Sequence, residues 1–523
     1  MDAELVRTGK ETPRLWRFYR VRSVGATEGR YPRTMPVPTS PGAPVPTLSP
    51  SLQALRATAL EVLHGNDLGD VTRPSPTLYP HQWLWDSCFI AIGLRHIDAE
   101  RAAAEVLSLL RGQWPNGMIP HVIFAEVDDF YHAGPQRWRC DRYVTTASGA
   151  QSTGITQPPM IAEAAVRVGE MLDPKARADF YRALLPGLIR FHQFLHTERD
   201  PDDDGLVTLV HSWESGMDNT PPWMEATLPI TPRRVKVLRR LGTAEALDAL
   251  RRDAKEVPAE ERLTSADLFT LYRVVRELRR SCYSFRSIRE TDVPLVQDVA
   301  FNAILVRAND HLVEIAAEVG VKLPKQLTRS MRRCREAIER LWSESTYYSR
   351  DFRTGELLLH ETVGGFLPLY AGVVPDDRVD GLVKAMTSPR YWPRYGVASV
   401  PADDPAFLPR CYWQGPAWIN INWLLADGLE RYGRLDAARE LRAGILNLIS
   451  GSGQMFEYYS PLDGTGAGSN SFSWTAALLV DLLARPDLPE IEATAARAAS
   501  RLGVSGVPDA RRASDQLPSP PIG

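Results

Sequence analysis

Residues 79–121 read YPHQWLWDSCFIAIGLRHIDAERAAAEVLSLLRGQWPNGMIPH. An aromatic and polar loop runs into an apolar helix expected over 89–96, with Asp86 or Ser87 as its N-cap. A second helix is expected over 99–111 and ends at Gly112, where another aromatic loop begins. Two helices joined by a short link, with long loops on either side, form the unit from which the fold can be predicted.

The same unit recurs along the chain. Apolar residues at helical spacing predict a helix over 49–64 and a long series of further helices. These lie at 158–172, 176–198, 243–254, 264–281, 296–319, 324–345, 377–387, 415–432, 434–450 and 472–484. Only 347–358 is typical of a strand pair. The pattern predicts an all-α fold and favours an α/α toroid whose loops share one open face. A helical solenoid is the alternative architecture.

Composition excludes several classes of protein. Apolar residues make up 44% of the 523 residues and the net charge is −3, so nothing favours a nucleic-acid or anionic-membrane partner. Five cysteines stand far apart without a CxxC pair, which implies neither a disulfide framework nor a zinc site. The polar N-terminus lacks a secretory signal, and no apolar run is long enough to span a bilayer. We expect a cytoplasmic enzyme without a metal or cofactor, and a homo-oligomer is compatible with the sequence.

Three regions follow from composition. Residues 1–48, rich in proline and arginine, predict a partly disordered leader. Residues 49–485 are expected to form the helical domain, with a lid-like insertion around 224–290. Residues 486–523, rich in alanine and proline, are interpreted as a tail.

Five loops share an unusual mixture of indoles, amides and carboxyls. They lie at 79–88, 113–121, 211–223, 411–423 and 454–461. One such loop could be ordinary packing at a helix end, but five exceed what packing needs. Flat apolar faces and planar polar groups are what carbohydrate recognition requires.

Glycoside hydrolysis needs two carboxyl groups, one protonated and one ionised. Asp218 and Glu457 are the natural pair, because each lies in an aromatic loop beside residues that interrupt regular structure. Glu214 and Asp86 are the competing acids. Asp86 is assigned a binding role, in which Trp83 and Trp85 form the floor of a sugar site, although capping a helix is compatible with that role.

Other chemistries fit less well. The stretch from Asp200 to Gly205 matches the start of a calcium loop, but the twelfth position, where a glutamate is required, is His211. An aspartate-rich turn is therefore favoured over a calcium site. The chain lacks a GxSxG elbow and the patterns of phosphate-binding and dinucleotide-binding loops.

Four motifs resemble, in order, those of the α/α-barrel glycosidases of glycoside hydrolase family 63. YPHQWLWDS at 79–87 resembles their QWxWDS loop, and ESGMDNTP at 214–221 resembles their ESGMDNSP loop. YWQGPAW at 412–418 and FEYYSP at 456–461 resemble their YWRGPxW and FxExYxP loops. The resemblance covers about 55–485 and is greatest to the bacterial mannosylglycerate and glucosylglycerate hydrolases.

This resemblance implies an (α/α)6 barrel and an inverting mechanism. Asp218 would be the general acid and Glu457 the general base, with Tyr79 at the rim of the terminal-sugar subsite and Glu214 behind the site or in contact with substrate. The expected substrate-binding residues are Tyr79, Trp83, Trp85, Asp86, Gln157, Trp213, Glu214, Arg262, Tyr412, Trp413, Gln414, Gly415 and Trp418.

The chain departs from the family pattern at several positions. Thr220 replaces a serine, and Gln414 stands where the family has arginine, which removes a charge from the sugar site. Residues 224–290 do not follow the family pattern closely. Arg262 is the candidate clamp for a glycerate carboxylate, and an exposed arginine at a helix start is the alternative interpretation.

These features predict an inverting α-glycoside hydrolase that acts on a small soluble glycoside. Glucosylglycerate is the first expectation and mannosylglycerate the second. The alternatives are an exo-acting α-glucosidase on oligosaccharides, similar to trehalase or amylo-1,6-glucosidase, and a carbohydrate-binding barrel without catalysis.

Overall fold

Six helices form a closed inner ring. They are α2 (Leu84–Leu94), α5 (Ile161–Gly169), α13 (Val299–Glu318), α15 (Leu367–Ala371), α17 (Ile419–Arg431) and α19 (Ser473–Leu483). Each packs against the next, and α19 packs against α2, which closes the ring. Every residue of α2 and α19 is buried, so apolar positions surround these two helices instead of forming a stripe. The ring decides the architecture: this is an all-α, (α/α)6-barrel fold.

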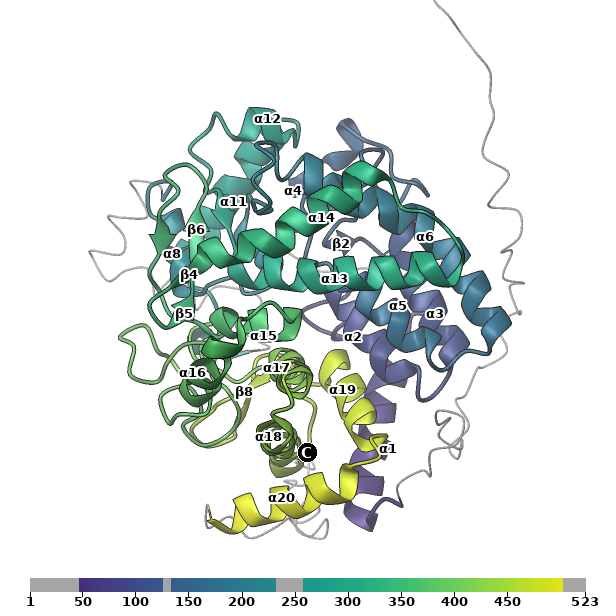
Figure 1. Cartoon of the computed structure of the whole chain (residues 1–523), viewed down its shortest axis with the longest axis vertical. Helices are drawn as coiled ribbons and strands as arrows, with labels where there is room; N and C mark the ends of the chain where they lie inside the picture. The colour runs from purple at the N-terminus through teal and green to yellow at the C-terminus, as the bar shows by residue number, and fades with distance from the viewer. Residues whose placement is uncertain (1–46, 126–132, 232–256, 502–523) are drawn as a thin grey trace, which may run out of the picture. The chain divides into compact units, whose positions relative to one another are not determined.

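An outer helix follows each inner helix after a short link. The outer helices are α3 (Ala99–Ser108), α6 (Pro174–Thr197), α14 (Lys325–Ala337), α16 (Asp376–Met386), α18 (Leu435–Ser452) and α20 (Leu488–Arg501). They are amphipathic; α14, for example, buries Leu327, Met331 and Cys334 and exposes charged residues. The first described helix, α1 (Pro50–Gly65), packs against α19, so it lies beside the last helix of the inner ring (Figure 1).

This computed structural model describes residues 47–125, 133–231 and 257–501. All of them fall in the unit Val37–Gly523. The expected leader over 1–48 lies almost wholly outside the described residues, as does the helix expected over 243–254.

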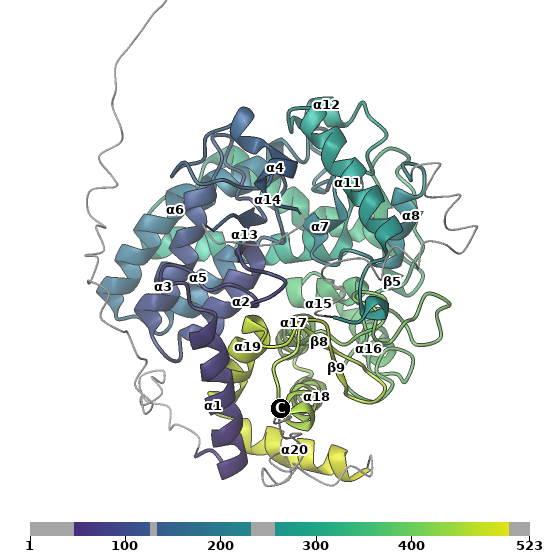
Figure 2. The ribbon, with the colours of Figure 1, turned by 180° about the vertical axis from the view of Figure 1, so that it is seen from behind.

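The connections that lead from an outer helix to the next inner helix are long and carry the remaining elements. Figure 2 shows α7, α8, α11 and the hairpin β8–β9 among them. One of these elements, α11 (Ser265–Arg280), is a helix of 16 residues. The others are short helices and 3-10 turns: η2 (Leu109–Gly112), α4 (Pro135–Trp138), η3 (Cys140–Arg142), α7 (Ser212–Ser215), α8 (Pro221–Thr227), η5 (Ala259–Glu261), α12 (Phe285–Ile288), η6 (Ile338–Leu341) and η7 (Val363–Phe366). Every inner helix begins where such a connection ends, so the expected shared loop face is confirmed.

Short antiparallel strands tie these connections together. β1 (Gln82–Trp83) pairs with β2 (Val122–Ile123), β4 (Trp342–Ser343) with β5 (Thr346–Tyr347), and β8 (Tyr458–Tyr459) with β9 (Gly466–Ala467). The strand pair expected within 347–358 is confirmed as β6 (Ser349–Asp351) and β7 (Leu357–Leu358), and β3 (Val296–Gln297) joins β6 from the other side. The other pairs could not be predicted from the sequence, because strands of two residues carry no visible alternation.

The start of α2 differs from the prediction. The helix begins at Leu84, after the extended residue Trp83, and not at 89 with Asp86 or Ser87 as its cap. The first-turn N–H groups find partners from other loops: Leu84 N donates to His121 O at 3.0 Å and Trp85 N to Gln157 Oε1 at 3.4 Å. Long-range partners therefore replace the local cap that composition predicts.

Two helices of the inner and outer rings, α15 and α20, were not predicted. The five-residue α15 is too short to show a helical period. Part of the stretch interpreted as a tail forms α20, which buries Leu488, Ile491 and Ala495 and packs against α18. Small alanine side chains suit this packing, although their number gave the segment the composition of a tail.

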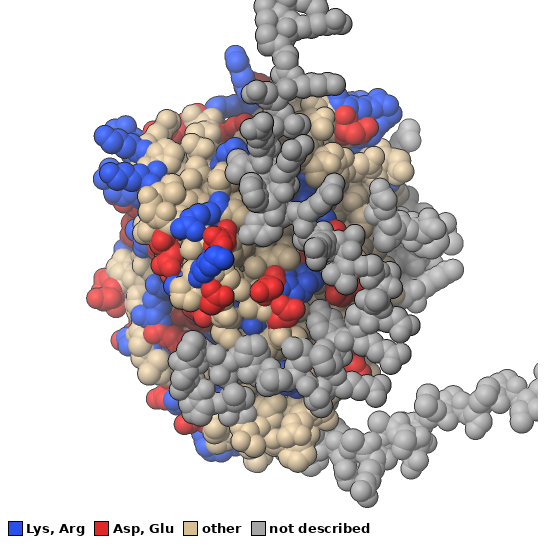
Figure 3. Space-filling model, turned by 90° about the vertical axis from the view of Figure 1, so that its right-hand side faces the viewer, with Lys and Arg blue, Asp and Glu red and all other residues tan. Residues whose placement is uncertain are grey.

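The surface mixes both signs of charge. On the face in Figure 3, basic and acidic side chains lie interspersed among uncharged residues. Among the described residues, none of the helices combines the length and apolar character that a membrane span requires.

Candidate active site

The candidate acid, Asp218, lies in the turn between α7 and α8. Gly216 ends α7 in the left-handed conformation at φ 71°, and a Cβ there would stand 2.6 Å from the ring of Trp85. Pro221 starts the next helix. Tyr412 Oη donates a hydrogen bond to Asp218 Oδ2 at 3.2 Å. Burial, assisted by the negative charge of Glu457, raises the pKa of Asp218 to about 7, and the Tyr412 hydrogen bond opposes that rise.

The candidate base, Glu457, immediately precedes β8 and is 1% exposed. Three donors hold its carboxylate. Tyr79 Oη donates to Oε1 at 2.7 Å, while Ser469 N donates to Oε2 at 3.0 Å and Arg262 Nη1 to Oε2 at 3.4 Å. Burial raises the pKa of Glu457, and the positive charge of Arg262 is the largest effect against it.

A third acid, Asp86, lies in the first turn of α2 and is buried. Burial raises its pKa well above the usual range, and the charges of Glu457 and Asp218 raise it further. Three carboxyl groups from distant parts of the sequence therefore lie in one site. Their mutual repulsion favours states in which some of them are protonated.

Arg262 lies beside both tyrosines that contact the acids. Its guanidinium carbon is 5.7 Å from the ring centre of Tyr79 and 5.3 Å from that of Tyr412. Its Nη1 donates to Tyr79 Oη at 3.2 Å as well as to Glu457. Arg262 was expected at a substrate carboxylate, and the structure places it on the expected base.

The loop 411–418 carries much of the aromatic surface. Tyr412 adopts φ 43°, an unfavourable conformation for a side chain of this size, and its hydroxyl reaches Asp218 from there. Trp413 N donates to Asn219 Oδ1 at 2.8 Å, which joins this loop to the turn of Asp218. Gly415 is sterically required, since a Cβ there would lie 2.6 Å from Leu408 O.

Indole rings line the region around this loop. Trp413 and Trp418 stack with centroids 3.7 Å apart and planes 2° apart. Trp85 lies 6.1 Å from Trp413, ring centre to ring centre, and Trp83 meets Tyr79 edge to face at 5.4 Å. Trp85, Trp413 and Trp418 therefore form a continuous group of indole rings, and Trp83 lies beside Tyr79; we call these four indoles the indole wall.

Three predicted contact residues are engaged elsewhere. Arg199 holds Glu214 at 2.9 and 2.7 Å, and the backbone N–H groups of Thr156 and Val210 donate to the same carboxylate. Glu214 thus fixes the loop behind Asp218. Trp213 packs on His121 at 6.2 Å between ring centres, and the Gln414 side-chain oxygen accepts from Cys411 Sγ at 3.5 Å.

Several residues at the site were missed. Ser469 donates to Glu457 through its backbone, which no side-chain motif reveals. Tyr458, next to Glu457 and 4.6 Å from Trp418 between ring centres, could have been selected as part of the aromatic loop. Glu261, next to Arg262, is 2% exposed, and a buried glutamate beside a candidate arginine is a weak signal in sequence.

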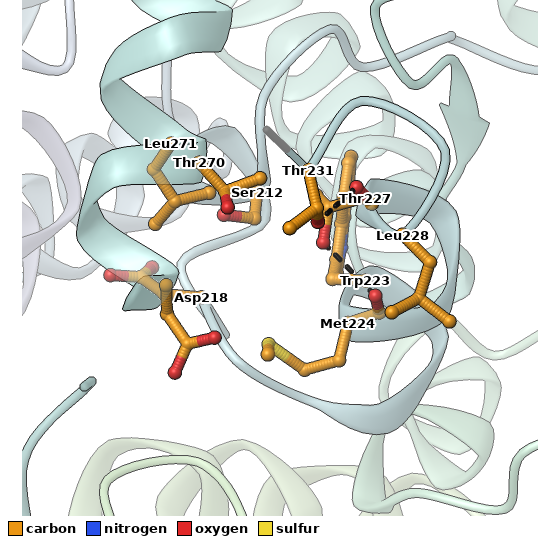
Figure 4. Close-up of a pocket in the computed structure, with 10 residues that line it drawn as sticks. Ser212, Asp218, Trp223, Met224, Thr227, Leu228, Thr231, Thr270 and Leu271 are labelled. Atoms are coloured by element: carbon orange, nitrogen blue, oxygen red, sulfur yellow. Dashed lines mark hydrogen bonds between the residues drawn. The ribbon is translucent and has the colours of Figure 1, made fainter. Parts of the chain in front are cut away.

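A pocket opens beside Asp218 (Figure 4). Its empty volume is about 310 Å³, part of it open to solvent. Apolar side chains and hydroxyl groups alternate around it. The lining residues are Ser212, Asp218, Trp223, Met224, Thr227, Leu228, Thr231, Asp267, Thr270 and Leu271.

In the part of the chain that the structure describes, no group of three or more His, Cys, Asp or Glu side chains is arranged to hold a metal ion. The acids of the 200–205 turn are engaged within the protein. Asp200 accepts from the backbone N–H groups of Asp204 and Gly205, each at 2.9 Å, and Asp203 forms an ion pair with Arg333. This stretch is an aspartate-rich turn.

Comparison with known proteins gives a consistent match. The family model of the mannosylglycerate hydrolase MGH1-like glycoside hydrolase domain matches residues 79–475. Mannosylglycerate hydrolase of Thermus thermophilus is 39% identical over 80% of this chain and 98% of its own length. Glucosylglycerate hydrolase of Mycolicibacterium hassiacum is 36% identical over 84% of this chain and 99% of its own.

A solved structure agrees with these sequence matches. The family 63 mannosylglycerate hydrolase from Thermus thermophilus, in complex with Tris and D-glycerate, superimposes with a TM-score of 0.74 and 39% identity. The match covers 82% of this chain and 99% of the other. The likeness therefore extends over nearly the whole helical domain and includes the loops that carry the site.

Proposed function

The chain belongs to the MGH1-like family of glycoside hydrolases, and from that premise we propose that it hydrolyses the α-glycosidic bond of a glycosylglycerate with inversion at the anomeric carbon. Glucosylglycerate is the first candidate and mannosylglycerate the second, and the relatives named for these two substrates cover 84% and 80% of the chain. A small carbohydrate as the partner and a cytoplasmic location belong to the same proposal.

The unequal surroundings of two carboxyl groups carry this proposal. Asp218 accepts from one tyrosine hydroxyl, and burial raises its pKa to about 7, which favours its protonated form more than in a free aspartate. Glu457 accepts from a hydroxyl, a backbone N–H and a guanidinium, all of which favour its ionised form. One acid and one base are what an inverting glycosidase needs.

The proposed reaction is a single displacement. Asp218 gives its proton to the glycosidic oxygen as the bond from that oxygen to the anomeric carbon breaks. A water molecule forms the new bond on the opposite face of the sugar and gives a proton to Glu457. Both residues then return to their starting protonation states by exchange with solvent.

The sugar is proposed to lie against the indole wall. Trp83, Trp85, Trp413 and Trp418 offer flat faces for the C–H side of a pyranose ring, and Asp86 offers a buried acceptor for its hydroxyls. Gln157 stays in this proposal, with its Oε1 accepting from Trp85 N at 3.4 Å and its amide nitrogen as the group for the sugar.

Arg262 is proposed to bind the glycerate carboxylate. Its guanidinium borders Tyr79 and Tyr412, the tyrosines that contact the two acids, and it has donors beyond the one that holds Glu457. Replacing Arg262 with alanine should raise KM for a glycoside with a carboxylate aglycone much more than for one with a neutral aglycone. Equal changes for both substrates would restrict Arg262 to its contact with Glu457.

A substrate panel tests the proposed function. α-Glucosides and α-mannosides, each with and without a carboxylate on the aglycone, are compared by kcat/KM. We expect glucosylglycerate and mannosylglycerate to exceed the neutral aglycones by at least an order of magnitude, since an interaction between opposite charges is lost without the carboxylate. Equal or faster turnover of neutral α-glucosides would contradict the proposal and favour an exo-acting α-glucosidase.

A further inference from the structure

One short segment of the α6–α13 connection bridges two other connections of the barrel. It consists of Glu261, the last residue of η5, and Arg262, and we call it the 261–262 segment. Arg262 reaches Glu457, as described above. Glu261 is buried and points to partners that lie 149 and 207 residues further along the chain.

Each hydrogen-bonding group of Glu261 has a distinct partner. Its Oε1 accepts from Arg410 Nε at 3.0 Å and from a second nitrogen of the same guanidinium. Its Oε2 accepts from Gly468 N at 2.9 Å, and its backbone oxygen accepts from Tyr458 Oη at 2.5 Å. Bonds of this kind to a buried carboxylate are among the stronger ones in proteins, because the acceptor is ionised.

Glu261 and two of its partners are chain neighbours of Glu457 or of the groups that hold it. Arg262, next to Glu261, donates to Glu457 Oε2. Ser469, next to Gly468, donates to the same oxygen through its backbone. Tyr458, the third partner, directly follows Glu457. Glu261 is thus the chain neighbour of one donor to the candidate base, and its partner Gly468 is the chain neighbour of a second. Its bond with Tyr458 fixes the residue beside that base.

The backbone of Gly468, which follows β9, lies close to the Glu457 carboxylate. Gly468 has φ 73°, and a Cβ there would lie 2.6 Å from Glu457 Oε2. The backbone of Gly468 therefore packs directly against the carboxylate. A shift of Gly468 moves both Ser469 N and the wall against which Glu457 rests.

We propose that Glu261, clamped by Arg410, is a positioning residue that sets the orientation of Glu457 through Arg262 and through the Gly468–Ser469 backbone. The inference rests on the proposed function of Glu457 as the base. Glu261 touches neither substrate nor the reacting water, and it acts by fixing three segments against one another. A glutamate that served only the stability of the hairpin would leave the properties of Glu457 unchanged.

Glu261 can change the pKa of Glu457 in two opposite directions, through its own charge and through the placement of Arg262 and Ser469. The negative charge of Glu261 raises the pKa of Glu457, whereas Arg262 lowers it more strongly. If Glu261 acted only through its charge, Glu261→Gln would lower the pKa of Glu457. If it holds Arg262 and Ser469 in place, Glu261→Gln loosens both donors and raises that pKa.

The experiment compares Glu261→Gln and Arg410→Ala with the wild-type chain in pH profiles of kcat and kcat/KM on the best glycosylglycerate. Arg335→Ala is the matched control. Arg335 lies on α14 and forms an ion pair with Asp310 at 2.6 Å, and its side chain is 38% exposed, against 43% for that of Arg410. Thermal melting reports whether each variant is folded. Glu457→Gln is measured in parallel as a test of the base itself.

We expect both Glu261→Gln and Arg410→Ala to lower kcat by at least about tenfold with KM within about twofold, because a misplaced catalytic group costs kcat. The acid limb of the pH profile should move to higher pH in both variants, and Arg335→Ala should have the kcat and the pH profile of the wild type. Unchanged kcat in a folded Arg410→Ala, or an acid limb that moves down in Glu261→Gln, would overturn the inference. Full activity of Glu457→Gln would instead refute the proposed function on which it rests.

Discussion

Tyr412→Phe should move the basic limb of the pH profile to higher pH. The limb reports Asp218, which must be protonated to act as the acid and has a pKa of about 7. Tyr412 Oη donates to Asp218 Oδ2 and so favours the ionised carboxylate. Without that hydroxyl the proton is held more tightly, so the pKa of Asp218 rises and activity persists to higher pH.

The geometry gives the size of this shift. A hydrogen bond to a charged group contributes roughly 1.5–3 kcal/mol, and one pKa unit corresponds to about 1.4 kcal/mol. The 3.2 Å distance from Tyr412 Oη to Asp218 Oδ2 is long for a bond between two oxygens, so the lower end applies. We therefore expect a shift of about one pH unit, measured as the basic limb of kcat/KM from initial rates between pH 4 and pH 10.

Tyr79→Phe is the matched control at the other carboxylate. Tyr79 Oη donates to Glu457 Oε1 at 2.7 Å and lowers the pKa of that group, so its removal should raise the acid limb and leave the basic limb in place. The two phenylalanine variants thus separate the two titrations. A basic limb that stays within about 0.3 units in Tyr412→Phe, or that moves equally in both variants, would refute the assignment of Asp218 as the acid.

Three further predictions concern other parts of the structure. Gly468→Ala should lower kcat by about a hundredfold in a folded protein, since the new Cβ would lie 2.6 Å from Glu457 Oε2, and wild-type turnover would contradict this packing. Asp218→Asn and Glu457→Gln should each lose hydrolysis with an unchanged thermal melt, and near-normal turnover in either removes that residue from its assigned role. Burial lowers the pKa of His196 from 6.5 to about 4, so as the pH falls the unfolded chain takes up this proton before the folded chain does, and the free energy of unfolding decreases from pH 6.5 toward pH 4. His196→Gln should remove up to about 3 kcal/mol of that decrease, measured in urea melts. An unchanged pH dependence of stability in the variant would exclude His196 as its cause.

The helical pattern predicted most of the fold. Helices of ten or more residues with clear apolar spacing, such as α13 and α18, lie close to the expected ranges. The parts of the fold that could not be predicted depend on tertiary contacts. The start of α2 depends on His121 and Gln157, and α20 becomes a packed helix only because α18 offers it an apolar surface.

The site was predictable to the extent that its residues lie in compact motifs. Asp218 and Glu457 were selected as candidates from their aromatic loops, and the structure places them close enough for the charge of Glu457 to raise the pKa of Asp218. Glu214 was a competing acid, expected behind the site or in contact with substrate, and the structure shows that Arg199 holds its carboxylate. Glu261 could not be found, because its importance lies in partners from two other loops.

Proton NMR of the sugar released in the first seconds of hydrolysis shows whether Asp218 and Glu457 cleave an α-glycosidic bond by a single displacement. We expect the β-anomer of glucose to appear first from α-glucosylglycerate and then to mutarotate. Appearance of the α-anomer first would contradict a single displacement, because that outcome requires a covalent intermediate and a nucleophile in place of a base.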